Sequence, residues 1–255
     1  MHPVDQFRQE LARLDRYPTG VVPVPRPIDG TAFFAAGSGL YCESPPSIAG
    51  LPRFPFDGVM FVGHNLDAEG PYHRRLELGI AHGDRLRPMR TWRGLYQLLD
   101  TAELAASECY FTNGYVGLVA GDKPTGLFPG ALDAQFSSWC QRFLRFQLLA
   151  MKPTVIATIG AEARRFVGLL SSGLHAWRRG PSMSVNRAEI EGHRFAAIAL
   201  AHPSMYPASA RHRSFQGERG MRADAALLRA AIVSSNSGRD DAQHVFGHFD
   251  PARDT

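Results

Sequence analysis

The sequence predicts an α/β fold of three layers, in which a central, mainly parallel four-stranded sheet carries helices on both faces. The strands are predicted from four short apolar runs, residues 58–63, 108–113, 154–160 and 194–201. Each run is too short and too continuously apolar for a surface helix, and such runs are typical of strands buried on both faces. Segments with helical spacing of apolar residues alternate with the runs and follow them, at residues 91–99, 133–151, 161–170 and 220–232. This alternation favours a parallel sheet.

The parts that flank this pattern are less regular. Apolar residues at helical spacing predict a further helix over residues 4–14, and residues 17–50 are rich in proline and glycine. We expect one domain over residues 1–235, in which residues 1–50 form an N-terminal helix and a covering segment. Residues 236–255 are polar and weakly patterned, so we expect a flexible tail there.

Composition excludes several classes of protein. The chain has 255 residues, of which 44% are hydrophobic and 20% charged, so it can bury a large core without disulfides or a structural metal. No apolar run approaches the length of a transmembrane helix, and the opening residues lack the features of a signal peptide. Cys42, Cys109 and Cys140 are odd in number and far apart, which indicates free thiols. We therefore expect a cytoplasmic protein with no membrane attachment.

The net charge is +4, and all but two of the 28 basic residues are arginines. Arginine suits phosphate groups and base edges, so a nucleic-acid partner is allowed. A GC-rich genome would account for the same bias.

Polar residues follow the predicted strands. Gly63, His64, Asn65 and Asp67 come at or after the end of the first strand, and Asn113 ends the second. The fourth strand is followed by His202-Pro203-Ser204, whereas residues 160–163 after the third form a turn that we interpret as structural. Because ligands bind at the carboxyl ends of parallel strands, we expect the polar residues to share a site.

This ordered set resembles the uracil-DNA glycosylase superfamily over roughly residues 56 to 232. Gly63-x-Asn65 resembles the motif after the first strand, in its asparagine-bearing form, and Asn113 resembles the asparagine that reads the uracil edge. Residues 160–163 resemble a Gly-x-x-Ala turn, and His202-Pro203-Ser204 resembles the motif that opens the late catalytic loop. The resemblance implies a hydrolase, a DNA glycosylase that cleaves the N-glycosidic bond of uracil or a related deaminated base. It implies DNA with a damaged base as partner; we expect no cofactor and a monomer.

The chain departs from the family pattern in three places. Leu66 and Asp67 stand where the family has proline and glycine. The three cysteines cannot supply the four ligands of an iron-sulfur branch, so we expect no cluster. No residue clearly matches the aromatic ring that stacks on the base, and Tyr72 is our candidate for it.

The chemistry of base release suggests roles for these residues. His202 would donate a hydrogen bond to the departing base anion, best as a neutral imidazole. Asn65 would orient the attacking water, and Asp67 would assist or replace it as the base. Asn113 would bind the base edge, together with Gly63, His64 and Tyr72. Structural roles stay open: a strand end for His202, turns for Asn65 and Asn113, and a helix cap for Asp67.

The segment after the His-Pro-Ser motif is the predicted DNA contact. Met205 and Tyr206 stand where the family inserts a wedge into the base stack, and Ser204 precedes them. Arg211 and Arg213 would bind phosphates, unless they belong to a solvated basic loop. His244 and His248 have metal-like spacing without acidic or cysteine partners, so we predict no metal site.

Two other functions fit the same residues. The departure at Leu66-Asp67 would suit a non-catalytic binder of modified bases or nucleotides. The modest net charge would suit a hydrolase of small nucleosides or nucleotides.

Overall fold

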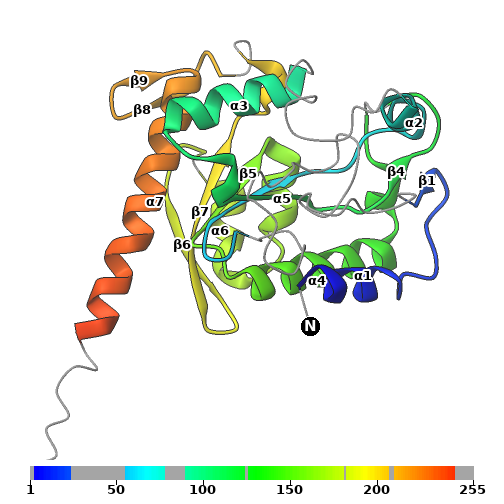
Figure 1. Ribbon diagram of the computed structural model, residues 1–255, viewed down its shortest axis with the longest axis horizontal. Coiled ribbons are helices and arrows are strands. Elements are labelled where there is room, and N and C mark those ends of the chain that lie inside the picture. Colours follow the sequence, from blue (N-terminus) through cyan, green and yellow to red (C-terminus); the bar gives the residue numbers. More distant parts are fainter. Residues whose placement is uncertain are drawn as a thin grey trace, which may run out of the picture.

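A computed structural model describes residues 3–23, 55–77, 90–123, 126–180, 182–206 and 210–244. Its centre is a five-stranded sheet with the strand order β3-β2-β5-β7-β6 (Figure 1). The strands are β2 (Val59–Gly63), β3 (Cys109–Asn113), β5 (Val155–Ile159), β6 (Asn186–Ile190) and β7 (His193–Leu200). β3, β2, β5 and β7 run parallel, and β6 pairs antiparallel with β7. The predicted α/β class and its four parallel strands are confirmed, and the predicted strand number is corrected from four to five.

Alternate side chains of β3 show that helices cover both faces of the sheet. Tyr110 and Thr112 donate their hydroxyl groups to the Gln147 side chain of α4 (Ala134–Met151), at 2.9 and 2.8 Å. Phe111, between them, packs against Trp92 of α3 (Arg90–Ala102). Because successive residues of a strand point to opposite faces, α3 and α4 lie on opposite sides of the sheet.

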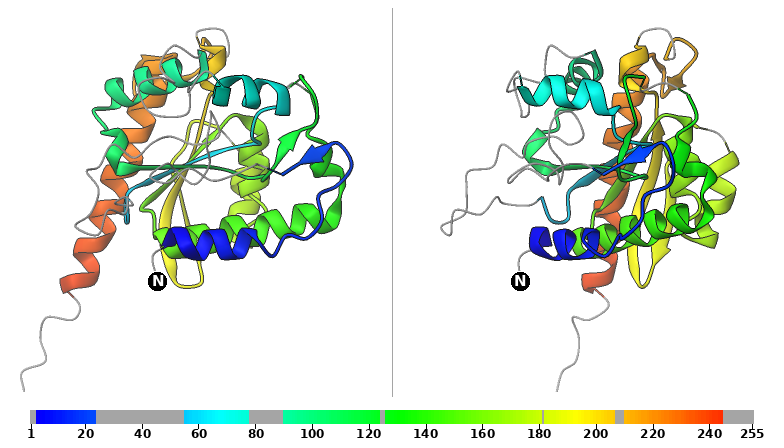
Figure 2. Two further views of the ribbon diagram at one scale, coloured as in Figure 1. Left: turned by 45° about the vertical axis from the view of Figure 1, so that its right-hand side comes forward. Right: turned by 90° about the vertical axis from the view of Figure 1, so that its right-hand side faces the viewer.

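Each helix layer contains a second helix. α7 (Met221–His244) packs against α3 and β7, and α1 (Pro3–Leu11) packs beside α4 (Figures 1 and 2). The Phe7 ring of α1 meets both Tyr110 of the sheet and Phe146 of α4. The result is the predicted arrangement of three layers, with the core between sheet and helices.

Strand β6 is the element of the sheet that the apolar runs do not predict. Its residues alternate between buried and exposed, as expected for an edge strand with one solvated face. It forms a hairpin with β7, in which Ile190 pairs with His193. Glu191 and Gly192 form the two-residue turn, with φ angles of 48° and 78°, which is the backbone that such tight hairpins need.

Several short elements complete the described chain. They are α2 (Glu69–Glu77), α5 (Ala161–Val167), α6 (His175–Arg179), the strand pairs β1 (Val21–Val22) with β4 (Leu118–Val119) and β8 (Ser214–Phe215) with β9 (Glu218–Arg219), and four 3-10 turns. The turns are η2 (Ala106–Glu108), η3 (Pro129–Leu132), η4 (Ser172–Leu174) and η5 (Pro203–Met205). Of the helices, α2 and α6 were not predicted from the sequence.

The last described helix is longer than expected. Helix α7 continues past residue 232 to His244, so residues 236–244 of the expected tail are helical, and the flexibility of residues 236–255 stays a prediction. Residues 245–255, and most of the covering segment, lie outside the described residues. Within the described part of the chain, no helix combines the length and apolar character needed to cross a membrane.

Candidate functional site

The carboxyl ends of four parallel strands meet at one edge of the sheet. From β2 the chain continues to β3 on one side and later to β5 on the other, so the strand order reverses between β2 and β5. In open α/β sheets, ligands bind beside such a reversal. The segments after β2, β3, β5 and β7 all begin at this edge, and they carry most of the predicted site residues.

Gly63 and Asn113 lie side by side at the ends of β2 and β3. They are register partners, and the Gly114 amide donates to the Gly63 carbonyl at 2.9 Å. A β-carbon on Gly63 would lie 2.2 Å from Oδ1 of Asn113, closer than atoms can approach. Only glycine therefore lets the Asn113 side chain lie across the end of β2.

The residues after Gly63 bond to each other. Nδ1–H of His64 donates to Oδ1 of Asn65 at 2.9 Å, and the Asn65 amide donates to the Leu66 carbonyl at 2.5 Å. Desolvation is the main influence on His64 and lowers its pKa, so the ring is neutral near pH 7. Asn65 thus has a fixed orientation, and its oxygen keeps a second lone pair for a further donor.

Asp67 has a local role at the start of α2. Its carboxylate accepts the Ala68 amide at 2.8 Å, and its carbonyl accepts the Val119 amide at 3.1 Å. The sequence left a helix cap open for Asp67 beside catalysis, and the bond to Ala68 fixes the turn just before α2.

Tyr72 does not offer its ring to a ligand. It lies in α2 and is 0% exposed, because its helix face packs into the core. The prediction that Tyr72 stacks on the base is therefore wrong for this structure.

His202 is exposed just beyond β7, and its tautomer follows from its neighbours. The Ser204 amide donates to Nδ1 of His202 at 3.3 Å, and the Ser204 hydroxyl lies 2.7 Å from the same nitrogen. Since a backbone amide can only donate, Nδ1 accepts, and the proton of the neutral ring sits on Nε2. Although part of the residue is exposed, the surrounding protein atoms partly desolvate it and lower the pKa of His202, which favours this neutral form. Ser204 thus orients His202, and its contact with DNA stays a prediction.

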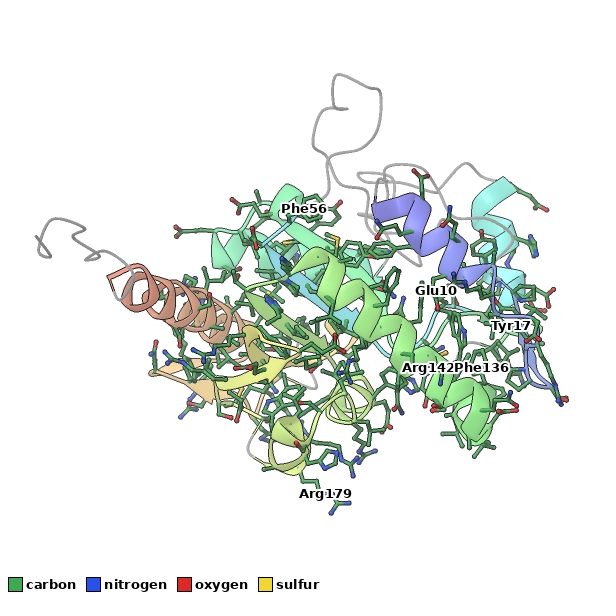
Figure 3. All side chains as sticks on the ribbon, turned by 90° about the horizontal axis from the view of Figure 1, so that it is seen from below. Glu10, Tyr17, Phe56, Phe136, Arg142 and Arg179 are labelled. Carbon is green, nitrogen blue, oxygen red and sulfur yellow. The ribbon has the colours of Figure 1, made fainter. Side chains whose placement is uncertain are left out.

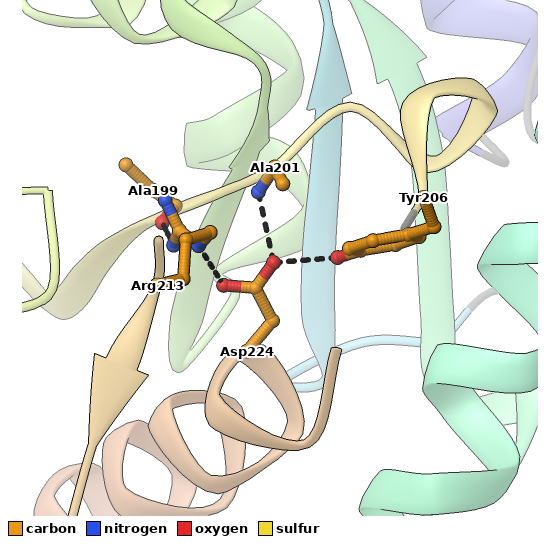
Figure 4. Close-up of polar contacts among 5 residues, drawn as sticks. All are labelled: Ala199, Ala201, Tyr206, Arg213 and Asp224. Atoms are coloured by element: carbon orange, nitrogen blue, oxygen red, sulfur yellow. Dashed lines mark hydrogen bonds and ion pairs between the residues drawn. The ribbon is translucent and has the colours of Figure 1, made fainter. Parts of the chain in front are cut away.

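A buried carboxylate holds the segment around His202 in place. Asp224, in the first turn of α7, is 0% exposed and accepts the Ala201 amide at 3.0 Å, the Tyr206 hydroxyl and Nε of Arg213 (Figure 4). Ala201 precedes His202 and Tyr206 follows it closely, so one carboxylate fixes both sides of the histidine.

This network corrects two predicted DNA contacts. Burial and the Asp224 carboxylate raise the pKa of Tyr206 far above its usual range, so its hydroxyl stays protonated and bound to Asp224. Arg213 pairs with Asp224 and also donates to the Ala199 carbonyl, so its guanidinium is used inside the fold. Arg211 is exposed and bonds to His212, which leaves it as a candidate phosphate contact. The wedge role of Met205 stays a prediction.

A pocket of about 360 Å³ opens at the strand-order reversal, against α5 and α6. His64 is the predicted site residue that lines it. Tyr115, Glu162 and Phe166 contribute to its walls, together with three arginines. Glu162 lies in the segment 160–163, for which the sequence suggests only a structural role, and Phe166 follows it in α5, so both an acidic and an aromatic side chain reach the pocket from this part of the chain.

Sequence reasoning missed Asp224 and, apart from His64, the residues that line the pocket. The signal for Asp224 was an acidic residue within the small apolar run Ala223–Ala226, on a helix face that packs inward. Among the residues that the structure describes, no three His, Cys, Asp or Glu side chains are grouped to hold a metal ion.

Comparison with known proteins agrees with this architecture. The chain matches the family model described as the uracil DNA glycosylase superfamily over residues 52–224, which is more than half of its length. No curated protein matches it. The match spans β2 to the first turn of α7, and so contains every strand end of the candidate site; the chain belongs to the uracil DNA glycosylase superfamily.

Proposed function

We propose that this protein is a DNA glycosylase that hydrolyses the N-glycosidic bond of uracil or a related deaminated base. The observation that carries the proposal is His202, a neutral imidazole with its proton on Nε2, at the same sheet edge as Asn113. A donor with a fixed tautomer is suited to stabilise a departing base anion.

The reaction breaks the bond between C1′ of the sugar and the base nitrogen. The oxygen of water bonds to C1′, and the departing base takes up a proton. Asn113, held over Gly63, offers an amide that complements the edge of uracil and leaves unpaired groups against cytosine. Asn65 orients the water through the free lone pair of its oxygen, and Asp67 shapes the turn.

The first experiment tests His202. Incubation with a uracil-containing oligonucleotide, followed by alkali, should cleave the strand. His202→Ala should lower the single-turnover rate by about 100-fold or more, with little change in DNA affinity. Equal losses of rate and affinity would show that His202 is structural. No cleavage of any deaminated base, in single- or double-stranded DNA, would reject the proposal.

The second experiment assigns the water-binding residue. If Asn65 holds the water, Asn65→Ala abolishes most of the single-turnover rate and Asp67→Ala has a mild effect. If Asp67 is the base, the order reverses, and the rate falls at low pH as the carboxylate takes up a proton. Near-wild-type rates in folded Asn65→Ala would overturn our assignment.

One observation favours a second candidate, a binder of modified bases without catalysis. Both polar groups of the Asn65 side chain bond to neighbouring residues. A binder would retain a deaminated base on the DNA without releasing it. Detection of the free base by chromatography separates the two functions.

A further inference from the structure

A pocket beside the candidate site contains neither Asn113 nor His202. Its volume of about 360 Å³ lies against α5 and α6, and small-molecule sites commonly measure roughly 300–1,000 Å³. It is therefore large enough for a ligand of its own.

Half of the residues that line this pocket are apolar or aromatic. Tyr115 and Phe166 are only 7% and 3% exposed, with ring centroids 4.6 Å apart. Leu127 and Leu169 are 65% and 40% exposed, although large apolar side chains are usually buried. Exposed apolar side chains that share a pocket are typical of a ligand site, and a flat apolar group such as a base would cover them.

The charged residues that line the pocket are mainly basic. They include Arg165, Arg178 and Arg179, and we call these three the arginine rim. Glu162 is the acidic residue among the lining residues and pairs with Arg165. Within the described part of the chain, neither Arg178 nor Arg179 forms an ion pair. Two guanidinium groups are thus left to bind an anion, and their planar geometry suits a phosphate.

The backbone that carries the rim is held from inside the fold. Arg164 is buried and donates to the carbonyl oxygens of Trp177 and Gly180, which flank the two rim arginines of α6. Its guanidinium also lies over the Trp177 ring, 5.3 Å from the centroid. The stem of Arg178 crosses Gly168, where a β-carbon would lie 2.5 Å from its Cβ. The backbone of Arg178 and Arg179 and the stem of Arg178 are thus held in place, so these two residues lose little freedom when they bind a ligand.

We propose that this pocket is a second nucleotide subsite, which takes an unpaired base against its apolar and aromatic lining residues and binds its phosphate at the arginine rim. The inference rests on the proposed function, because DNA that reaches the adjacent strand ends would supply the nucleotide. A free mononucleotide presents the same chemistry, so the test includes both sources.

The test uses probes whose base is cytosine, because Asn113 in the proposed excision site would leave unpaired groups against it. Deoxycytidine 5′-monophosphate and deoxycytidine are compared by calorimetry, and single-stranded oligodeoxycytidylate is titrated by fluorescence anisotropy at fixed salt. Arg178→Ala and Arg179→Ala should each weaken binding of at least one phosphate-bearing probe by about tenfold. Deoxycytidine should bind at least tenfold more weakly than its monophosphate if the free nucleotide is the ligand. Rim-dependent binding of the oligonucleotide alone would identify the DNA strand as the source.

Two further variants control the test. Arg142→Ala removes an exposed arginine from α4, well apart from Arg179 (Figure 3), and should leave both affinities unchanged. Leu169→Trp fills the pocket and should abolish binding of the rim-dependent probe, while circular dichroism confirms the fold.

The outcomes separate the two proposals. If neither phosphate-bearing probe responds to the rim variants, or if Arg142→Ala has an equal effect, the subsite is refuted whatever the excision activity. If the probes respond but no deaminated base is released, the subsite stands and the glycosylase proposal fails.

Discussion

Asp224 allows the sharpest test of how the fold positions His202. Asp224→Ala would leave the Arg213 guanidinium, the Tyr206 hydroxyl and the Ala201 amide without their shared acceptor. Removing one partner of a buried ion pair typically costs about 3–5 kcal/mol. For a domain of this size, that loss corresponds to a Tm lower by roughly 6–20 °C. Urea unfolding followed by tryptophan fluorescence measures the free energy of unfolding directly.

Asp224→Asn separates the ion pair from the other two hydrogen bonds. One carboxylate oxygen accepts both Ala201 and Tyr206, and the other accepts Arg213. The amide oxygen of asparagine can still accept hydrogen bonds from Ala201 and Tyr206. The free energy of unfolding should therefore fall by only about 1.5–3 kcal/mol, and the variant should retain more excision activity than Asp224→Ala. Asp100→Ala, at an exposed position of α3, is the matched control. If Asp224→Ala lowers the free energy of unfolding by less than about 1 kcal/mol, the stabilising role that we infer for Asp224 is refuted.

Three further predictions follow from the site and the core. His64 and His202 have lowered pKa values in the folded state, so the unfolded chain takes up protons first as the pH falls through about 6.5. The free energy of unfolding should decline below that pH, and a glutamine at either position should reduce the slope in urea titrations. Gly63→Ala should lower excision at least tenfold by displacing the neighbouring asparagine, whereas Gly173→Ala, whose nearest contact is 3.8 Å, should be neutral. Burial raises the pKa of Cys140 to about 12, so mass spectrometry should find this thiol unmodified by iodoacetamide at pH 8 until urea unfolds the protein.

The core of the fold could be predicted because its signals are local. Each of the four parallel strands is a continuous apolar run, and the start of α4 is marked by Asp133, which accepts the Phe136 amide as an N-cap. Strand β6 was not predicted because its five residues contain only two apolar side chains, Ala188 and Ile190, and so form no continuous apolar run.

The site was harder to predict because its decisive contacts join distant residues. Tyr206 and Arg213 have the composition of a DNA-binding loop, and only Asp224, eleven or more residues further along, turns both inward. Likewise, the role of Arg164 depends on carbonyl groups of another helix. Nothing in the local sequence indicates such pairings.

The hairpin of β6 and β7 has a consequence for how the chain folds. Its strands are joined by two residues, so they can pair with little loss of chain entropy, whereas β7 meets its parallel neighbour β5 only after a long crossover closes. A strand that has already paired on one side presents an ordered edge to the next. We therefore expect the β6–β7 hairpin to form before β5 pairs with it, so that the segment leading to His202 has its direction before the remaining strand ends assemble around it.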